Sequence, residues 1–225
     1  RRRLLDGDWD VAEGAAFAEF NRPTHVCEPF ELPRGWPRFR TADYGYSSPS
    51  CILWGAVDHD GNLWIYRELY SKRLTADALA DAIFEAEAYD PPMYASVLDK
   101  SCWNRVAGAP SVAQTMIQRG IRWLPSNSDR MSGKLELHKR LQLNEDSGEP
   151  HLKIFSTCTN LVRTLPTIPL SRTNSEDVDT KSEDHAYDAL RYLCMLRQIN
   201  NTNFSSWSNR IKDTAPEPRD IVFGY

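Results

Sequence analysis

The chain has 225 residues, with 31 acidic and 27 basic side chains and a formal net charge of −4 at pH 7. Its hydrophobic content of 41%, with 7 Trp, 9 Tyr and 8 Phe, is typical of a globular protein with a sizeable core and argues against a disordered chain. No apolar stretch approaches the roughly 18 residues that a membrane-spanning helix needs. Taken alone, the negative net charge argues against a nucleic-acid partner.

Residues 1–36 show little periodicity and are interrupted by Pro23, Pro29, Pro33 and Gly35. This pattern predicts a connector that wraps onto a domain beginning near Trp36. The chain has no initiator Met, so we expect it to be an excised or processed fragment with something upstream in the parent protein. The five cysteines are widely spaced without a CxxC or CxxH pair, which favours reduced thiols over a disulfide framework or a zinc site.

Three consecutive strands are predicted next, over residues 39–44, 51–57 and 63–66. The turn-forming pair Asp60-Gly61 lies between the second and the third strand and favours an antiparallel hairpin. A helix is expected over 75–89, with Thr75 as its N-cap. The strand that follows a helix in this way is typically parallel to an earlier one.

The rest of the chain alternates between helices and strands. We expect a strand at 94–99, a helix at 111–119 closed by Gly120, a strand at 121–124, a loop at 127–134 leading into a helix at 135–143, a strand at 152–155, a helix at 158–165, a mobile loop at 170–182 and a helix at 183–198. That last helix is predicted to begin with a capping box of Thr180 and Glu183, or with Ser182 as N-cap. This order predicts an α/β fold: one mixed sheet with an antiparallel part, flanked by helices, over 37–199, followed by a loosely ordered tail at 200–225.

Three aspartates stand on separate predicted elements. Asp43 and Asp99 lie at the ends of two strands, and Asp188 lies in the second turn of the last helix, whose Asp184 and His185 share its face. Read singly, a strand-end Asp is more often a cap or turn residue, and Asp184 complements the helix dipole.

If the three carboxylates meet, their mutual repulsion calls for a cation. Carboxylate oxygens select hard divalent ions such as Mg²⁺ or Mn²⁺. Two such ions, roughly 4 Å apart, stabilise the attacking and leaving oxygens in phosphodiester cleavage.

The string Glu183-Asp184-His185-Ala186-Tyr187-Asp188-Ala189-Leu190-Arg191-Tyr192 resembles the closing signature of the nuclease domain of tailed-phage terminase large subunits. Asp43-Tyr44-Gly45 and Val97-Leu98-Asp99 are similar to the two earlier aspartate motifs of that family. Arg1 to Asp10 resembles the segment that joins the packaging ATPase to the nuclease. No GxxxxGK[ST] pattern occurs, so residues 1–36 are read as a connector from an ATPase domain that this chain lacks.

The resemblance implies an RNase H-like fold and a metal-dependent endonuclease that cuts concatemeric double-stranded viral DNA during genome packaging. It implies Asp43, Asp99 and Asp188 as catalytic ligands of two Mg²⁺ or Mn²⁺ ions. It also implies His185 as a further catalytic residue and Asp184 as an auxiliary acid. The alternatives are another RNase H-like nuclease, of the resolvase or transposase type, and a non-catalytic docking module of the packaging machine.

DNA also has to be held. The stretch 119–140 carries six basic against two acidic residues, and it supplies the DNA-binding candidates Arg130, Lys134, Lys139 and Arg140. A solvated helix face is the competing interpretation. Segment 176–188 holds six acids against one base, so the negative charge is concentrated near the candidate metal site and the net charge does not exclude DNA. The resemblance further implies a monomeric fragment in the host cell cytoplasm, with the portal and the terminase small subunit as partners of the full-length protein and no membrane association.

Overall fold

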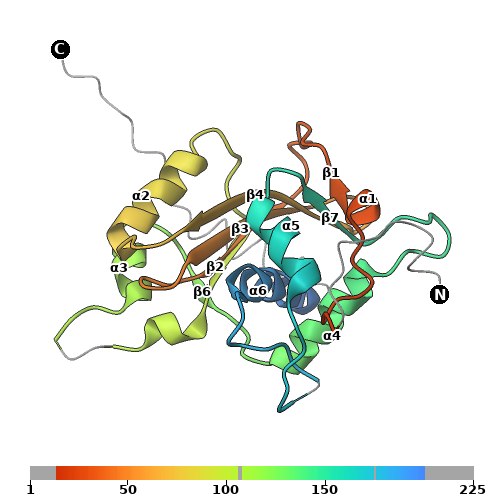
Figure 1. Cartoon of the computed structure of the whole chain (residues 1–225). Coiled ribbons are helices and arrows are strands. Elements are labelled where there is room, and N and C mark those ends of the chain that lie inside the picture. Colours follow the sequence, from red (N-terminus) through yellow and green to blue (C-terminus); the bar gives the residue numbers. More distant parts are fainter. Residues whose placement is uncertain (1–13, 106–107, 175, 201–225) are drawn as a thin grey trace.

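The computed structural model describes residues 14–105, 108–174 and 176–200, with side chains up to residue 196. One seven-stranded sheet in the order β1-β7-β4-β3-β2-β5-β6 forms its centre (Figure 1). The strands are β1 (Val26–Cys27), β2 (Arg38–Asp43), β3 (Ser50–Val57), β4 (Leu63–Ser71), β5 (Ala95–Leu98), β6 (Leu124–Pro125) and β7 (Leu152–Phe155). The α-helices are α1 (Arg22–His25), α2 (Ala76–Ala86), α3 (Val112–Gln118), α4 (Arg130–Leu141), α5 (Thr159–Thr164) and α6 (His185–Asn200), and two 3₁₀ helices are η1 (Lys100–Trp103) and η2 (Leu165–Thr167).

The centre of the sheet follows the sequence prediction. Strands β2, β3 and β4 are antiparallel neighbours, and β5 runs parallel to β2 on its other side. Strand β6 covers only Leu124–Pro125, so the predicted strand at 121–124 is wrong except at its last residue. The apolar signal there has another cause: Ile121 and Trp123 are buried in the core beneath α2 and α3.

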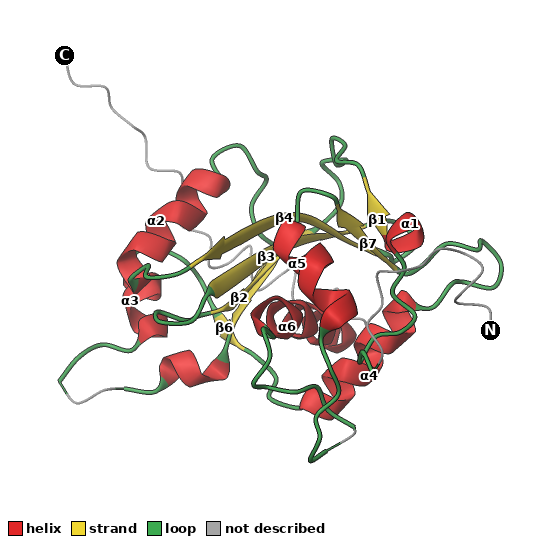
Figure 2. Ribbon diagram, in the orientation of Figure 1, coloured by secondary structure: helices red, strands yellow, loops and turns green. Residues whose placement is uncertain are grey.

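Helices cover both faces of the sheet, as Figure 2 shows by the coils on either side of the strands. Side chains of successive strand residues point to opposite faces, so Phe39 joins the larger core with α4, α5 and α6, whereas Ala42 joins the smaller core with α2 and α3. The buried hydroxyl of Thr41 donates a hydrogen bond to the carbonyl of Ala189, 2.8 Å away, and thereby fixes α6 across β2. The predicted mixed α/β sheet flanked by helices is confirmed.

The amino-terminal part of the described chain belongs to this core. Phe17 and Phe20 are fully buried in it. Strand β1 pairs in parallel with β7 and forms one edge of the sheet. The division at residue 36 stays a prediction; what the structure adds is that residues 14–36 pack against the sheet.

Helix α4 begins earlier than expected, and the predicted loop at 127–134 is wrong in its second half. Asp129 is the N-cap, because its carboxylate accepts a hydrogen bond from the backbone N–H of Ser132 at 3.0 Å. Gly133 lies inside the helix at a close approach to α6: a Cβ built there would lie 2.4 Å from Cγ of Arg191. Gly133 is therefore required for the packing of α4 against α6 and does not mark a loop.

Helix α6 begins at His185, so the predicted capping box of Thr180 and Glu183 and the alternative Ser182 cap are not formed. The carbonyl of Asp184 accepts the first hydrogen bond, from the N–H of Asp188 at 2.8 Å. Glu183 turns away from the helix and accepts hydrogen bonds from Arg163 and from the Tyr70 hydroxyl.

The segment before α6 was predicted as a mobile loop, and in the structure it is irregular but internally bonded. Val178 is buried and forms a bridge with Leu170. The N–H of Ser171 donates to the carbonyl of Asp177 at 2.9 Å. The five cysteines, all within the described residues, form no disulfide bond. Within the described ranges, no helix combines the length and the apolar character that a membrane crossing requires.

Candidate metal centre

Two of the predicted acids lie side by side at the carboxyl ends of parallel strands. Ala42 of β2 pairs with Leu98 of β5, so Asp43 and Asp99 are the next residues along neighbouring strands. The N–H of Asp99 extends the ladder by donating to the carbonyl of Ala42 at 3.0 Å. This edge of an α/β sheet is where binding sites commonly form.

The first turn of α6 brings His185 to Asp43. The imidazole Nδ1–H donates to a carboxylate oxygen of Asp43 at 2.9 Å, and both side chains are largely buried. The hydrogen bond to Asp43 raises the pKa of His185. Burial raises the pKa of Asp43, and the negative charges of Asp188 and Asp99 add to this increase, although the bond from His185 opposes it.

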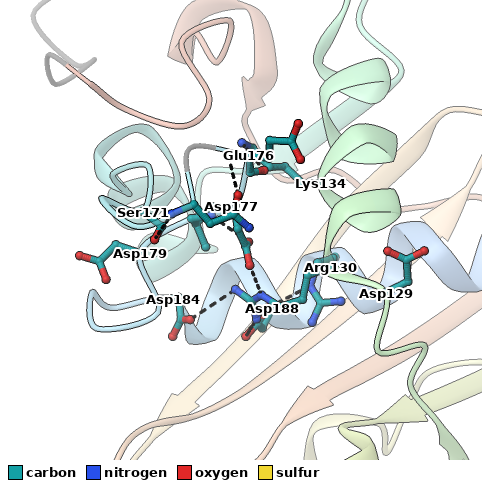
Figure 3. Close-up of polar contacts among 12 residues, drawn as sticks. Asp129, Arg130, Lys134, Ser171, Glu176, Asp177, Asp179, Asp184 and Asp188 are labelled. Atoms are coloured by element: carbon teal, nitrogen blue, oxygen red, sulfur yellow. Dashed lines mark hydrogen bonds and ion pairs between the residues drawn. The ribbon is translucent and has the colours of Figure 1, made fainter.

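Asp188, one turn further along α6, is engaged by two arginines. Nη1 of Arg130 lies 3.1 Å from each carboxylate oxygen, and Nε of Arg191 donates to one of them at 3.0 Å. Figure 3 shows Arg130 reaching from α4 to Asp188, with Asp129 pointing away from the cluster. Asp188 is 9% exposed, so its charge is largely shielded from water and balanced by protein cations.

Asp184 and Asp177 complete the surroundings of Arg130. Nε of Arg130 donates to Asp177 at 2.8 Å, and Nη2 lies 3.9 Å from Asp184 (Figure 3). Burial and the nearby charge of Asp188 raise the pKa of Asp184 to about 6. Three carboxylates thus surround one guanidinium.

The carboxylate of Asp99 is bonded to a residue close in sequence. Its carboxylate accepts hydrogen bonds from the backbone N–H and from the hydroxyl of Ser101 at the start of η1. The cap interpretation, which the sequence left open, thus describes this residue in the structure. Asp99 is still close enough for its charge to raise the pKa of Asp43.

The three acids share one region without being arranged as a ready-made set of ligands. Among the described residues, no group of three or more His, Cys, Asp or Glu side chains is placed so that it could hold a metal ion. Each predicted ligand has an internal partner instead: His185 for Asp43, Ser101 for Asp99, and Arg130 with Arg191 for Asp188.

The residues nevertheless fit a hard divalent cation. Their donors are carboxylate oxygens, and the raised pKa of Asp43 reflects burial close to two other negative charges. A cation among them would remove this repulsion.

Three of the four basic side chains predicted to bind DNA are bonded to other groups of the protein. Arg130 is bound to Asp188, Lys134 is buried and donates to the carbonyl of Glu176 at 2.9 Å, and Arg140 is buried against Glu136 at 3.1 Å. Lys139 is exposed. DNA binding by these side chains stays a prediction.

Sequence reasoning did not anticipate the partners of the acids. Nothing in the sequence distinguishes Asp177 from the other acids of segment 176–188, and no local pattern marks Ser101 as the partner of Asp99. Arg191 follows Asp188 by three residues, a spacing at which oppositely charged side chains meet on a helix, so this pair was detectable. The contact between Arg130 and Asp177 joins residues 47 positions apart, and nothing local signals it.

No protein-family model and no curated protein sequence matches the chain. Solved structures do. The nuclease domain of the P22 large terminase matches with a TM-score of 0.66 and 19% identity, over 83% of this chain and 94% of that one. The large terminase of the thermophilic bacteriophage D6E matches with a TM-score of 0.67 and 18% identity, over 83% of this chain and 46% of that one.

The nuclease of the large terminase from the thermophilic phage G20c, in a structure with bound cobalt, matches with a TM-score of 0.57 and 13% identity, over 82% of this chain and 98% of that one. A second structure of the same nuclease contains bound zinc. These matches show that the chain has the RNase H-like α/β fold. More particularly, its fold is that of the nuclease domain of phage large terminases, as the resemblance in sequence implied. The chain spans about half the length of the D6E protein.

Proposed function

We propose that this chain is the nuclease domain of a phage packaging terminase and cuts double-stranded viral DNA with the help of Mg²⁺ or Mn²⁺. The main support is that Asp43 and Asp99 end the neighbouring strands β2 and β5, and that Asp188 on α6 is close enough for its charge to raise the pKa of Asp43. The fold is shared with terminase nucleases. The cobalt and zinc in the G20c structures support the use of a divalent ion.

The residues have distinct roles in this proposal. Asp43, Asp99 and Asp188 would hold the ions, and His185 would orient the carboxylate of Asp43 through the bond at 2.9 Å. When bound, two divalent ions would supply charge stabilisation for the attacking water and for the leaving oxygen of the phosphodiester. Asp184 would act as an auxiliary acid beside Asp188.

The proposal extends to the surroundings of the protein. In the parent protein, the amino-terminal segment would follow a packaging ATPase, and the portal and the small subunit would be partners. The chain would act as a monomer in the cytoplasm of the host cell. Lys139, which is exposed on α4, is the basic candidate best placed to meet a DNA phosphate.

Incubation with supercoiled plasmid in Mn²⁺ or Mg²⁺, with and without EDTA, tests the activity. We expect cleavage that EDTA abolishes and that Asp43→Asn lowers by at least about 100-fold. Loss of a residue that only supports a metal ligand already lowers activity by up to about 100-fold, and Asp43 is a proposed ligand itself. Asp60→Asn is the matched control, because Asp60 is exposed in the turn between β3 and β4. That turn follows Val57, at the opposite end of β3 from Cys51, the residue that pairs with Asp43.

Two outcomes would contradict this reasoning. Cleavage that persists in EDTA or in Asp43→Asn would exclude the metal-dependent mechanism at this site. Intact plasmid under every metal condition would favour a non-catalytic docking module.

A further inference from the structure

Arg130 occupies the position of a counter-ion inside the acidic cluster. Its guanidinium contacts Asp177 and Asp188 through hydrogen bonds and faces Asp184 at 3.9 Å. The side chain is 26% exposed, and its planar group lies near the ring of Tyr187, with 6.0 Å between the guanidinium carbon and the ring centroid. This is more contact than a surface arginine on a solvated helix makes.

Arg130 is hydrogen-bonded to the carboxylate oxygens of Asp188 that would coordinate a metal ion. Nη1 lies 3.1 Å from both carboxylate oxygens of Asp188. A divalent ion bound to either oxygen would lie within a few ångströms of a guanidinium that carries the same sign of charge, and the two repel strongly at this depth of burial. Arg130 and an ion at Asp188 therefore compete.

Arg130 has a second carboxylate partner besides Asp188. Nε is bonded to Asp177 on the segment before α6, and that segment is tied to α4 by Lys134, which donates to the carbonyl of Glu176. A change in the outer torsion angles of the side chain would withdraw Nη1 from Asp188, and Asp177 beside Nε would remain a nearby carboxylate for the displaced guanidinium.

We propose that Arg130 is an internal counter-ion that holds Asp188 in the metal-free protein and is displaced when a divalent cation binds. Arg130 is a positioning residue in this scheme, and the scheme rests on the proposed function above. The freed Nη groups would then be available to a phosphate oxygen, a ligand that a guanidinium binds well. The predicted DNA contact of Arg130 would thus arise only after the cation has taken its place.

Titration of the metal-free protein with Mn²⁺, followed by the electron paramagnetic resonance of free Mn²⁺, measures this competition without DNA or turnover. We expect Arg130→Gln to bind Mn²⁺ about tenfold more tightly than the wild type, at the low end of the 10- to 1,000-fold by which a neighbouring unit charge shifts the protonation equilibrium of a carboxylate. Arg130→Lys keeps the charge but loses the planar fork, so its affinity should lie between the two. Arg34→Gln removes the same charge from an exposed position before the start of β2 and should leave the affinity unchanged.

Thermal unfolding provides a second test, in which the loss of Arg130 is expected to weaken the metal-free protein instead of strengthening metal binding. Without metal, Arg130→Gln should unfold at a lower temperature than the wild type, because three carboxylates lose their shared cation. Saturating Mn²⁺ should reduce this difference, because the ion replaces the lost charge.

The possible failures are distinguishable. If the wild type binds Mn²⁺ and Arg130→Gln binds it equally or more weakly, the counter-ion proposal is overturned while the proposed function stands. If Asp188→Asn binds Mn²⁺ as well as the wild type does, or if no variant binds it, the metal site itself is refuted. If Arg130→Gln does not fold, the comparison of Arg130→Lys with the wild type decides the question.

Discussion

Replacing Gly133 with alanine tests the contact between α4 and α6 that supports the site. A Cβ at this position would lie 2.4 Å from Cγ and 2.8 Å from Cδ of Arg191, and 3.4 Å from Cγ of Met195. Arg191 is 2% exposed and its Nε is bonded to Asp188. The arginine stem therefore cannot move aside without disturbing a ligand candidate.

Two opposing effects set the size of the change. Alanine stabilises a helix interior by about 1 kcal/mol relative to glycine. Overpacking a well-filled contact costs about 1–3 kcal/mol. Because the overlapping atoms belong to a buried and bonded stem, we expect the cost to prevail and Gly133→Ala to destabilise the protein by about 1 kcal/mol, which lowers the melting temperature by about 2–4 °C in a domain of this size.

Urea denaturation followed by tryptophan fluorescence measures the free energy of unfolding. Gly35→Ala is the matched control, since a Cβ there would meet no atom within 4 Å, and it should be neutral or slightly stabilising. A Gly133→Ala variant as stable as the wild type, or more stable, would refute the close approach of α4 to Arg191.

Two further predictions concern the core and the pH dependence of stability. Phe17→Ala removes a fully buried ring that packs 5.3 Å from the ring of Tyr187, so it should cost about 3–5 kcal/mol in urea denaturation. Phe84→Ala, at an exposed ring on α2, is the control, and a cost of Phe17→Ala no larger than that of the control would contradict the placement of Phe17 in the core. Hydrogen bonds from Arg163 lower the pKa of Glu183 to about 2 from its ordinary 4.5, so the pair stabilises the protein above about pH 4.5 and this contribution is lost as the pH falls towards 2. Both side chains are about half exposed, so Glu183→Gln should cost less than about 1 kcal/mol at pH 7, and a cost undiminished at pH 3 would contradict the assignment.

Local patterns were sufficient to predict the sheet centre and the helix that carries Asp188. The runs at 39–44 and 51–57 combine apolar and β-branched residues with clear turns between them, and their pairing is local along the chain. The start of α4 was missed because Ser132 and Gly133 disfavour a helix locally. Packing against α6 outweighs that propensity, and no neighbouring residue in the sequence reports it.

The candidate site was predictable in its acids and not in their partners. Asp43, Asp99 and Asp188 are marked by strand ends and by a helical motif, which are features of the local sequence. The two arginines that neutralise Asp188 come from the start of α4 and from the next turn of α6. The acid that anchors Arg130, Asp177, comes from an irregular segment. Such contacts depend on how distant elements pack, so residues with identical local patterns can end as ligands, caps or counter-ions.

The short strand β1 has a practical consequence for preparing this domain. It pairs with β7 at one edge of the sheet, through Val26 with Ile154 and Cys27 with Phe155. A recombinant fragment started at residue 37 would expose the unpaired backbone of β7, together with the apolar surface that Phe17 and Phe20 cover. Open strand edges of this kind recruit other chains, so such a truncation should yield aggregates, whereas a fragment that begins before residue 14 retains its own edge protection.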